Sequence, residues 1–158
     1  MTIISPHDKN PLIDGRQSER AMSIRRGVQR VLRDFRFSML PELTLVTGRR
    51  TDIIAVGEKG EIWIIEIKSS IEDFKVDTKW PEYCDYCDRL FFATLQDVPQ
   101  EIFPEDCGFI VADNFGGHIL RDAPEHKLSG GRRKSLMLRF ARTAADRLLV
   151  AEIAANPI

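Results

Sequence analysis

The chain has 158 residues, of which 43% are hydrophobic, enough for one domain with a buried core and too few for two domains of ordinary size. We therefore expect a single domain over residues 18–158, preceded by a flexible arm over residues 1–17. No apolar run approaches the ~20 residues of a membrane span, and the first residues lack the layout of a signal peptide. Three cysteines do not form a disulfide framework, so the composition favours a cytoplasmic protein without membrane contact.

The net charge of −1 hides three blocks of opposite sign. Residues 16–50 contain nine arginines and three acidic residues, which gives a net charge of +6. Residues 127–147 also carry +6, whereas residues 51–126 contain 17 acidic and six basic residues, a net charge of −11. Basic ends around an acidic centre suit a polyanion held over a carboxylate-rich site that contains cations. Solvated helix faces are the alternative, and for charge runs in general they are the commoner one.

An amphipathic helix is predicted over residues 18–36, with Ser18 as its N-cap. Its apolar residues recur at helical spacing and fall within an arc of about 100°. The opposite side of this helix contains Arg26, Arg30 and Arg33. Contact with phosphate groups and simple solvation are equally compatible with this arginine face.

Three strands are predicted after this helix. The first covers Leu43 to Val46, and the second and third cover Thr51 to Val56 and Ile62 to Ile67. The last two strands form a hairpin about the turn of residues 57–60, and Arg49 and Arg50 lie just before it. Because the hairpin strands are apolar on both faces, we expect the three strands to form the middle of a mixed sheet. The helix near residues 18–36 and the helix near residues 132–153 are expected to cover its two sides.

Three ionisable residues lie within or next to the apolar strands of the hairpin. Alternation along a strand places Asp52 on the face of Ile54, and it places Glu66 and Lys68 together on one face of the partner strand. A buried ion is costly unless it shifts its pKa, finds an opposite charge or binds a metal. Two carboxylates and a lysine indicate a site for a hard metal ion. A purely structural salt bridge is the less favoured alternative, because buried ion pairs often cost more than they return.

The second half of the chain predicts a loop over residues 69–78, a short helix that begins near Pro81, and a strand over residues 90–95. A hairpin over residues 107–120 and a helix over residues 132–153 follow. The helix has an apolar stripe of Met137, Ala141, Ala144 and Leu148, and its other face contains Arg132, Arg139, Arg142 and Arg147. Cys84 and Cys87 have zinc-like spacing, but a zinc site needs four ligands, so buried and chemically idle thiols are the better interpretation. The three histidines have no spacing that joins them to each other or to the acids.

The arrangement of Asp52, thirteen further residues and then Glu66-Ile67-Lys68 resembles the D…ExK motif of the PD-(D/E)XK nuclease superfamily. The predicted order of helix, three strands, helix and strand is also similar. The resemblance implies a restriction-endonuclease-like α/β fold, with a mixed central sheet flanked by helices. Thr51 stands where the superfamily often has a proline before the aspartate.

Longer stretches, among them GRRTDIIAV, GEIWIIEIKSS, GFIVAD and RRKSLMLRFARTAADRL, resemble the bacterial MmcB family of DNA-repair proteins over most of residues 18–150. This resemblance implies a role in the response to DNA damage. It also implies that further residues border the same site, namely Asp73, Asp77, Lys79, Trp80 and Tyr83. For these residues, a solvated loop and core packing are the alternatives. Glu42 is a further carboxylate near the first predicted strand, although a glutamate in a turn is more often exposed.

These observations predict a metal-dependent DNA nuclease. Mg²⁺ or Mn²⁺ would be bound by the carboxylates of Asp52 and Glu66. By resemblance, the carbonyl group of Ile67 would be a third ligand, and Lys68 would assist the attacking water or offset charge on the phosphate. The expected partner is DNA, branched or damaged, with a repair protein or a second copy of the chain as further candidates. The residues expected to contact DNA are Arg26, Arg30, Arg33, Arg49, Arg50, Arg132 and Arg139.

The alternative is a module that has the nuclease fold and binds DNA or a partner protein without cutting DNA. The three charged residues in apolar surroundings favour the nuclease, because a site without catalytic use has no reason to hold them there.

Overall fold

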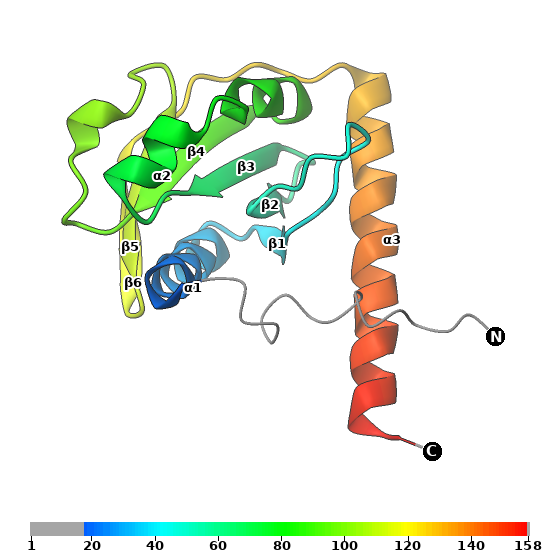
Figure 1. The fold of residues 1–158 in the computed structure, drawn as a ribbon. Helices are drawn as coiled ribbons and strands as arrows, with labels where there is room; N and C mark the ends of the chain where they lie inside the picture. The colour runs from blue at the N-terminus through cyan, green and yellow to red at the C-terminus, as the bar shows by residue number, and fades with distance from the viewer. Residues whose placement is uncertain (1–17, 158) are drawn as a thin grey trace.

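The computed structural model describes residues 18–157, so the predicted arm over residues 1–17 lies outside the described part. Figure 1 shows a sheet with helices packed around it. In chain order the helices and strands are α1 (Glu19–Asp34), β1 (Ser38–Pro41), β2 (Ile53–Val56), β3 (Ile62–Ile67), α2 (Ile71–Val76), η2 (Trp80–Tyr86), β4 (Arg89–Thr94), η3 (Gln100–Ile102), β5 (Gly108–Asp113), β6 (Gly116–Arg121) and α3 (Gly130–Ala155). The two η elements are 3₁₀ helices.

The six strands form one mixed sheet in the order β1-β2-β3-β4-β5-β6. The pairs β3–β4 and β4–β5 are parallel, and the other three pairs are antiparallel. This sheet confirms the predicted α/β class with a mixed central sheet and flanking helices. The apolar faces of the first three strands had suggested that they form the middle of the sheet, and this prediction was wrong. They form one half of it, with β1 at the edge.

The first strand was predicted in the wrong place. The structure has β1 at Ser38–Pro41, whereas residues 43–46 belong to a loop held by one isolated bridge between Thr44 and Arg50. Pro41 is tolerated in β1 because an edge strand leaves one row of its backbone groups outside the ladder. Leu43 and Leu45 are still buried, so their hydrophobicity reflects core packing rather than a strand.

The predicted hairpin between β2 and β3 is confirmed, with Ile53 opposite Ile65. Its turn has the Gly57 N–H bonded to the Glu61 carbonyl and the Gly60 N–H bonded to the Gly57 carbonyl. Gly60 has φ +86°, a left-handed conformation that favours glycine. The register places alternate residues of both strands on the same face of the sheet, which decides where Asp52 and Glu66 point.

Helix α1 covers one face of the sheet. The Ser18 hydroxyl accepts a hydrogen bond from the Ala21 N–H, which confirms the predicted N-cap. The inward side of α1 packs on β3, β4 and β5 through a core that includes Ile24, Val28 and Leu32, all fully buried. Gly27 allows close approach, since a Cβ there would lie 2.3 Å from the Asp113 carbonyl oxygen.

The opposite face of the sheet is covered by several short pieces instead of one long helix. Its core contains residues from α2, η2 and η3 together with Leu136 of α3. We had expected the last helix to cover this face. In Figure 1, α3 instead runs alongside the β1 edge, and its C-terminal part extends beyond the sheet. Leu136 is the one buried residue among the 26 of α3.

Helix α2 was missed, because residues 69–78 were interpreted as a loop. The Ser70 hydroxyl accepts a hydrogen bond from the Asp73 N–H and caps this helix. A serine followed three residues later by an acidic residue is a helix-start signal that was available in the sequence. The predicted short helix at Pro81 is the 3₁₀ helix η2, with Pro81 in its first turn.

The three cysteines are free thiols. Cys87 and Cys107 are buried, and burial raises the pKa of the Cys107 thiol to about 12. Burial also raises the pKa of Cys87 well above its ordinary value. These two thiols are therefore protonated and weakly reactive at neutral pH. Cys84, which was predicted to be buried with Cys87, is only partly buried, and burial raises the pKa of its thiol as well.

Candidate active site

Asp52 and Glu66 meet where the β2–β3 ladder opens. The Ile67 N–H donates a hydrogen bond of 2.8 Å to Asp52 Oδ2, and the Asp52 N–H donates one of 3.1 Å to Glu66 Oε1. Each carboxylate is thus fixed by a backbone N–H of the partner strand. Both side chains leave the same face of the sheet, opposite α1, as strand alternation had predicted.

The electrostatics of this carboxylate pair are unfavourable. Burial raises the pKa of Asp52, and the hydrogen bond from the Ile67 N–H offsets only part of that rise. Burial also raises the pKa of Glu66 well above its ordinary value, and the negative charge of Asp52 raises it further. Glu66 is only 4% exposed. Two buried carboxylates of raised pKa would gain free energy from a bound cation.

Lys68 does not pair directly with either of these carboxylates. Its Nζ lies 2.5 Å from Asp77 Oδ2, and both side chains are largely buried. The second oxygen of Asp77 accepts hydrogen bonds from the backbone N–H groups of Lys79 and Trp80. Burial raises the pKa of Asp77, but the hydrogen bonds from Lys68 and from the Lys79 N–H are stronger in effect and lower it overall. The loop before η2 therefore fixes the position of the Lys68 ammonium group.

Ile67 presents its backbone to the same place. The N–H and C=O groups of one strand residue point to the same neighbouring strand. Since the Ile67 N–H donates to Asp52, its carbonyl oxygen also faces β2. The register places Thr51 opposite Ile67, but the Thr51 N–H bonds to the Leu43 carbonyl instead, so the ladder ends here and the Ile67 carbonyl lies beside the carboxylate pair.

Tyr83 and Glu42 border the pair. The Tyr83 hydroxyl donates a hydrogen bond of 2.9 Å to the Arg50 carbonyl. Burial raises the pKa of Tyr83, and the charges of Glu66 and Asp52 raise it further, so these acids lie close to the ring. The Glu42 N–H bonds to the Asp52 carbonyl, and the charge of Glu42 contributes to the raised pKa of Asp52.

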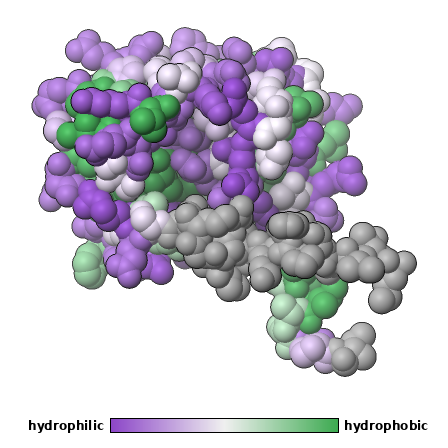
Figure 2. Space-filling model, viewed as in Figure 1, coloured by the Kyte–Doolittle hydropathy of each residue, from purple (hydrophilic) through white to green (hydrophobic). Residues whose placement is uncertain are grey.

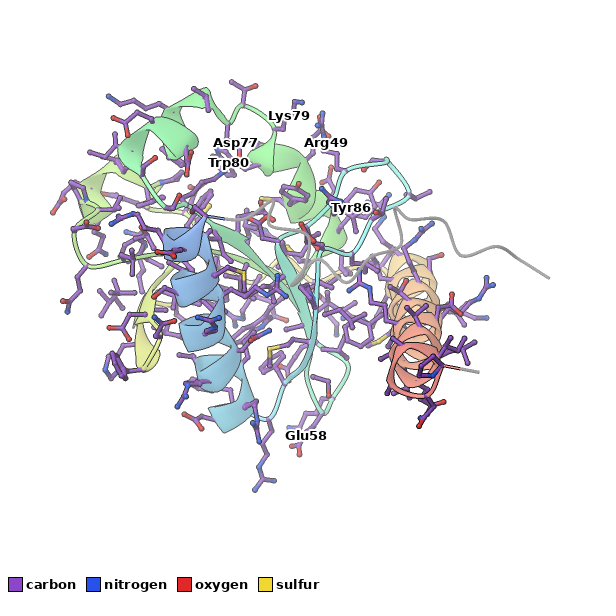
Figure 3. The ribbon with its side chains drawn as sticks, turned by 60° about the horizontal axis from the view of Figure 1, so that its bottom comes forward. Arg49, Glu58, Asp77, Lys79, Trp80 and Tyr86 are labelled. Atoms are coloured by element: carbon purple, nitrogen blue, oxygen red, sulfur yellow. The ribbon has the colours of Figure 1, made fainter. Side chains whose placement is uncertain are left out.

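The remaining predicted border residues have contacts of their own. Trp80 packs its ring edge-on against Phe92, with 5.3 Å between ring centroids. Asp73 accepts a hydrogen bond from the Ser69 hydroxyl and helps to cap α2. Figure 3 shows Asp77, Lys79 and Trp80 together with Arg49 at one end of the molecule, with Glu58 of the hairpin turn at the opposite end.

Two arginines near this site were not predicted. Arg25 of α1 is fully buried, and burial lowers its pKa while the charges of Glu42 and Asp52 raise it in part. Arg147 of α3 donates hydrogen bonds to the carbonyl groups of Pro41 and Glu42. At about 100° per residue, Arg25 falls at the border of the apolar arc of α1, and this signal could have found it. The helical pattern misplaced Arg147, because it put this residue on the face opposite an apolar stripe that includes Leu148. The structure has Arg147 on the packed side and Leu148 exposed.

The predicted DNA-contacting arginines do not form one surface. Arg26, Arg30 and Arg33 line a hollow of about 360 Å³ on α1, on the other side of the sheet from the carboxylate pair. Arg49 pairs with Glu82, and Arg50 lies 3.9 Å from Glu42, both near the site. Arg132 and Arg139 line a second hollow, of about 810 Å³, along α3. The structure therefore brings only Arg49 and Arg50 close to the carboxylates.

Within residues 18–157 no cluster of three or more His, Cys, Asp or Glu side chains has the geometry of a metal site. The donor atoms available for a metal ion are therefore the two carboxylates of Asp52 and Glu66 and the neighbouring carbonyl of Ile67. This set suits Mg²⁺, which keeps several waters and often uses one or two carboxylates. It does not suit zinc, which takes four protein or solvent ligands rich in nitrogen and sulfur.

No sequence pattern indicated a second buried carboxylate, Asp88, at the other end of β3. It accepts hydrogen bonds from the N–H groups of Ile62 and Leu128 and two from the guanidinium of Arg133. Burial raises the pKa of Asp88, but these hydrogen bonds lower it to about 2. Asp88 therefore attaches the start of α3 to the sheet.

No helix in the described residues is long and apolar enough to cross a membrane.

The fold and the carboxylate pair define an α/β protein with a mixed six-stranded sheet, flanking helices and a buried acidic site at the open end of a hairpin. The sequence profile of the MmcB-like DNA repair proteins matches residues 8–155. The chain therefore belongs to the MmcB-like family, and this membership indicates a role in DNA repair.

One solved structure supports the fold. A protein of unknown function from Silicibacter pomeroyi is 41% identical, and the match covers 87% of this chain and 92% of that chain with a TM-score of 0.81. A search of curated proteins gives no significant match.

Proposed function

We propose that this protein is a metal-dependent nuclease of the PD-(D/E)XK superfamily that hydrolyses phosphodiester bonds of DNA during repair. The observation that carries the proposal is the placement of Asp52 and Glu66, which are each held by a backbone N–H of the neighbouring strand on one face of the sheet, with Lys68 fixed beside them. Burial raises the pKa of both carboxyl groups, and a bound cation would offset the cost of ionising them. The motif spacing and the family's role in repair agree with the proposal. The proposed substrate is branched or damaged DNA.

Asp52, Glu66 and the carbonyl of Ile67 would hold Mg²⁺ or Mn²⁺. The cation, when bound, would neutralise phosphate oxygens and lower the pKa of an attacking water. Both carboxylates are already oriented by backbone N–H groups, so little side-chain entropy remains to be lost on binding.

Lys68 would orient the attacking water or offset the charge that develops on the phosphate. Asp77 would keep its ammonium group in place, because Asp77 is itself held by two backbone N–H groups. Arg49, Arg50 and Lys79, at the same end of the molecule, would contact DNA phosphates nearest to the site. The α1 arginines would contact only DNA that extends around the sheet edge.

A second candidate is a DNA-binding or partner-binding module with this fold and no catalysis. The observation in its favour is the Lys68–Asp77 ion pair, which already neutralises the lysine that a nuclease would use. In such a module, the Lys68–Asp77 ion pair would stabilise the fold and take no part in a reaction.

Cleavage assays separate the two functions. Purified protein is incubated with labelled branched, single-stranded and duplex DNA in Mg²⁺ or Mn²⁺, beside Lys68→Ala and the matched control Lys59→Ala from the exposed hairpin turn. The nuclease predicts products with the wild type and Lys59→Ala, and retained DNA binding without products with Lys68→Ala. A wild type that cuts no DNA form, together with a destabilised Lys68→Ala, would overturn the nuclease and favour the module.

A further inference from the structure

Helix α3 packs on the rest of the protein through one side only. Leu136 is buried, and Met137 and Phe140 pack on the same core. Arg133 and Arg147 of the same side bind Asp88 and the Pro41 and Glu42 carbonyls. The helix is therefore attached to the rest of the protein from Arg133 to Arg147, and its other side makes none of these contacts.

The other side of α3 is also apolar. Leu138, Leu148, Leu149 and Ile153 are each at least half exposed. At about 100° per residue these four side chains fall within an arc of about 140° that lies opposite Phe140 and Arg147. Figure 2 shows hydrophobic surface on the part of α3 that extends beyond the sheet. Contiguous exposed leucines on a helix mark a contact surface more often than a solvated one.

Charged residues within this arc and beside one of its edges follow an order along the helix. Lys134, Arg139 and Arg142 lie toward its N-terminal end, and Asp146 and Glu152 lie toward its C-terminal end. Among residues 18–157, Lys134, Arg142, Asp146 and Glu152 form no salt bridge within 4.0 Å. A helix with opposite charges at its two ends is complementary to an antiparallel copy of itself.

We propose that the exposed side of α3 binds the same side of α3 in a second copy of the chain, antiparallel and about a two-fold axis near residues 143–144. In a two-fold contact each residue pair occurs twice, with the residues exchanged. Residue numbers that add to about 286 then lie opposite each other. This places Leu138 against Leu148 and Leu149.

The same register satisfies these charges. Lys134 and Glu152 share one angular position inside the arc, between Leu148 and Leu138, and each would face the other residue in the second copy. Arg139, Arg142 and Asp146 fall toward one edge of the arc, where Asp146 would lie between the two arginines of the second copy. In an antiparallel two-fold pair, the same edge of each helix meets its equivalent in the other copy. One register therefore brings together the leucines and places each acidic residue near a basic one.

The second hollow gives this partner room. It runs along α3 and is lined by Leu138, Arg142, Val46 and Tyr86, among others. Val46 is 72% exposed, so side chains of the second copy could cover it as well. The overlap from residue 134 to residue 152 would be about 27 Å long at 1.5 Å per residue.

This inference does not depend on the nuclease assignment, and its test uses no cleavage assay. Sedimentation of the full chain over a range of concentrations is expected to show a dimer at about 10 μM and above. Leu148→Glu should weaken association at least about 30-fold, because it places two carboxylates in an apolar seam. Leu120→Glu is the matched control, since Leu120 is similarly exposed on β6 and the substitution should leave association unchanged.

A charge exchange tests the register. Lys134→Glu and Glu152→Lys should each weaken the dimer about 10-fold, because each places like charges together. The double variant should restore the wild-type association. Circular dichroism of each variant controls for folding.

Three results would overturn the inference: a monomeric wild type at every concentration, a dimer insensitive to Leu148→Glu, or a double exchange that fails to recover. A monomer whose α3 amides are protected from hydrogen exchange at every dilution would show that another part of the same chain covers the helix.

Discussion

The two ends of strand β3 hold buried carboxylates in opposite electrostatic states. At its start, Asp88 receives two backbone N–H groups and both arms of the Arg133 guanidinium, and its pKa falls to about 2. At its other end, Asp52 and Glu66 receive one backbone N–H each and no direct cation, and burial raises the pKa of both. A satisfied acid and an unsatisfied pair therefore lie at opposite ends of one strand.

The difference separates structure from function. A carboxylate whose hydrogen bonds and charge are satisfied stabilises the fold, and its removal costs stability. A pair held together against its own repulsion lowers stability unless it binds something, and the proposed cation site rests on this argument. The following predictions test this contrast, from the largest expected effect to the smallest.

Neutralising the unsatisfied pair should abolish activity without harming the fold. Asp52→Asn or Glu66→Gln is expected to lower the cleavage rate about 1,000-fold, since each removes a charged ligand of the cation. In the absence of metal, thermal melting of Glu66→Gln should match or exceed the wild type, because a costly buried charge is gone. Glu58→Gln in the exposed hairpin turn is the control. A large stability loss in Glu66→Gln would show that this pair is structural like Asp88.

Neutralising Asp88 should lower the stability of the fold, in contrast to neutralising Glu66. Asp88→Asn is expected to lower the free energy of unfolding by about 3 kcal/mol, because it leaves Arg133 and a backbone N–H without full partners. Urea denaturation measures this loss, and Asp122→Asn, at an exposed acid, should change it little. An unchanged midpoint for Asp88→Asn would remove the contrast between the two ends of β3.

The pH dependence of stability should carry the signature of Asp88. Its folded pKa of about 2 lies below the ordinary value of 3.8, so the stabilisation is complete above about pH 4 and is lost as pH falls through about 2. The shift corresponds to about 2 kcal/mol. The difference between wild type and Asp88→Asn should therefore shrink between pH 4.5 and pH 2. A constant difference over this range would contradict the assignment.

Freeing Lys68 should affect the chemical step alone. Asp77→Asn is expected to lower kcat about 10-fold with little change in KM for DNA, because Lys68 loses its anchor but Asp52 and Glu66 remain. Asp77→Glu should recover part of the rate, and exposed Asp85→Asn on η2 should have no effect. Single-turnover kinetics distinguish these cases. An equal rise in KM would mean that Asp77 contributes to DNA binding instead.

The smallest effect concerns the α1 arginines, which lie on the far side of the sheet from the pair. If they contact duplex DNA, reversing Arg30 and Arg33 to Glu should flatten the log–log dependence of affinity on salt by about 0.9 for each phosphate that the variant no longer binds. Fluorescence anisotropy over a salt series measures this slope, with exposed Lys127→Glu as the control. A slope that does not change would show that this face is merely solvated.

The hairpin and its charged face were determined by the sequence. β-branched runs about a glycine turn specify the pairing of β2 with β3, and alternation places Asp52, Glu66 and Lys68 on one face. The helical spacing of α1 likewise separates its buried side from Arg26, Arg30 and Arg33. These are nearest-neighbour properties, so local periodicity is sufficient to predict them.

The partners of these charges were decided by the tertiary structure. Asp77 reaches Lys68 only because α2 and the turn before η2 fold back over the end of β3, and Arg133 meets Asp88 across 45 residues of chain. The first strand lies at Ser38–Pro41 and not at residues 43–46 for a similar reason. Leu43 and Leu45 are apolar because the loop that contains them packs into the core. Contacts between distant segments depend on loop geometry and on competition for the same core. For this reason a pattern of residue types could show where charge is buried but not which residue neutralises it.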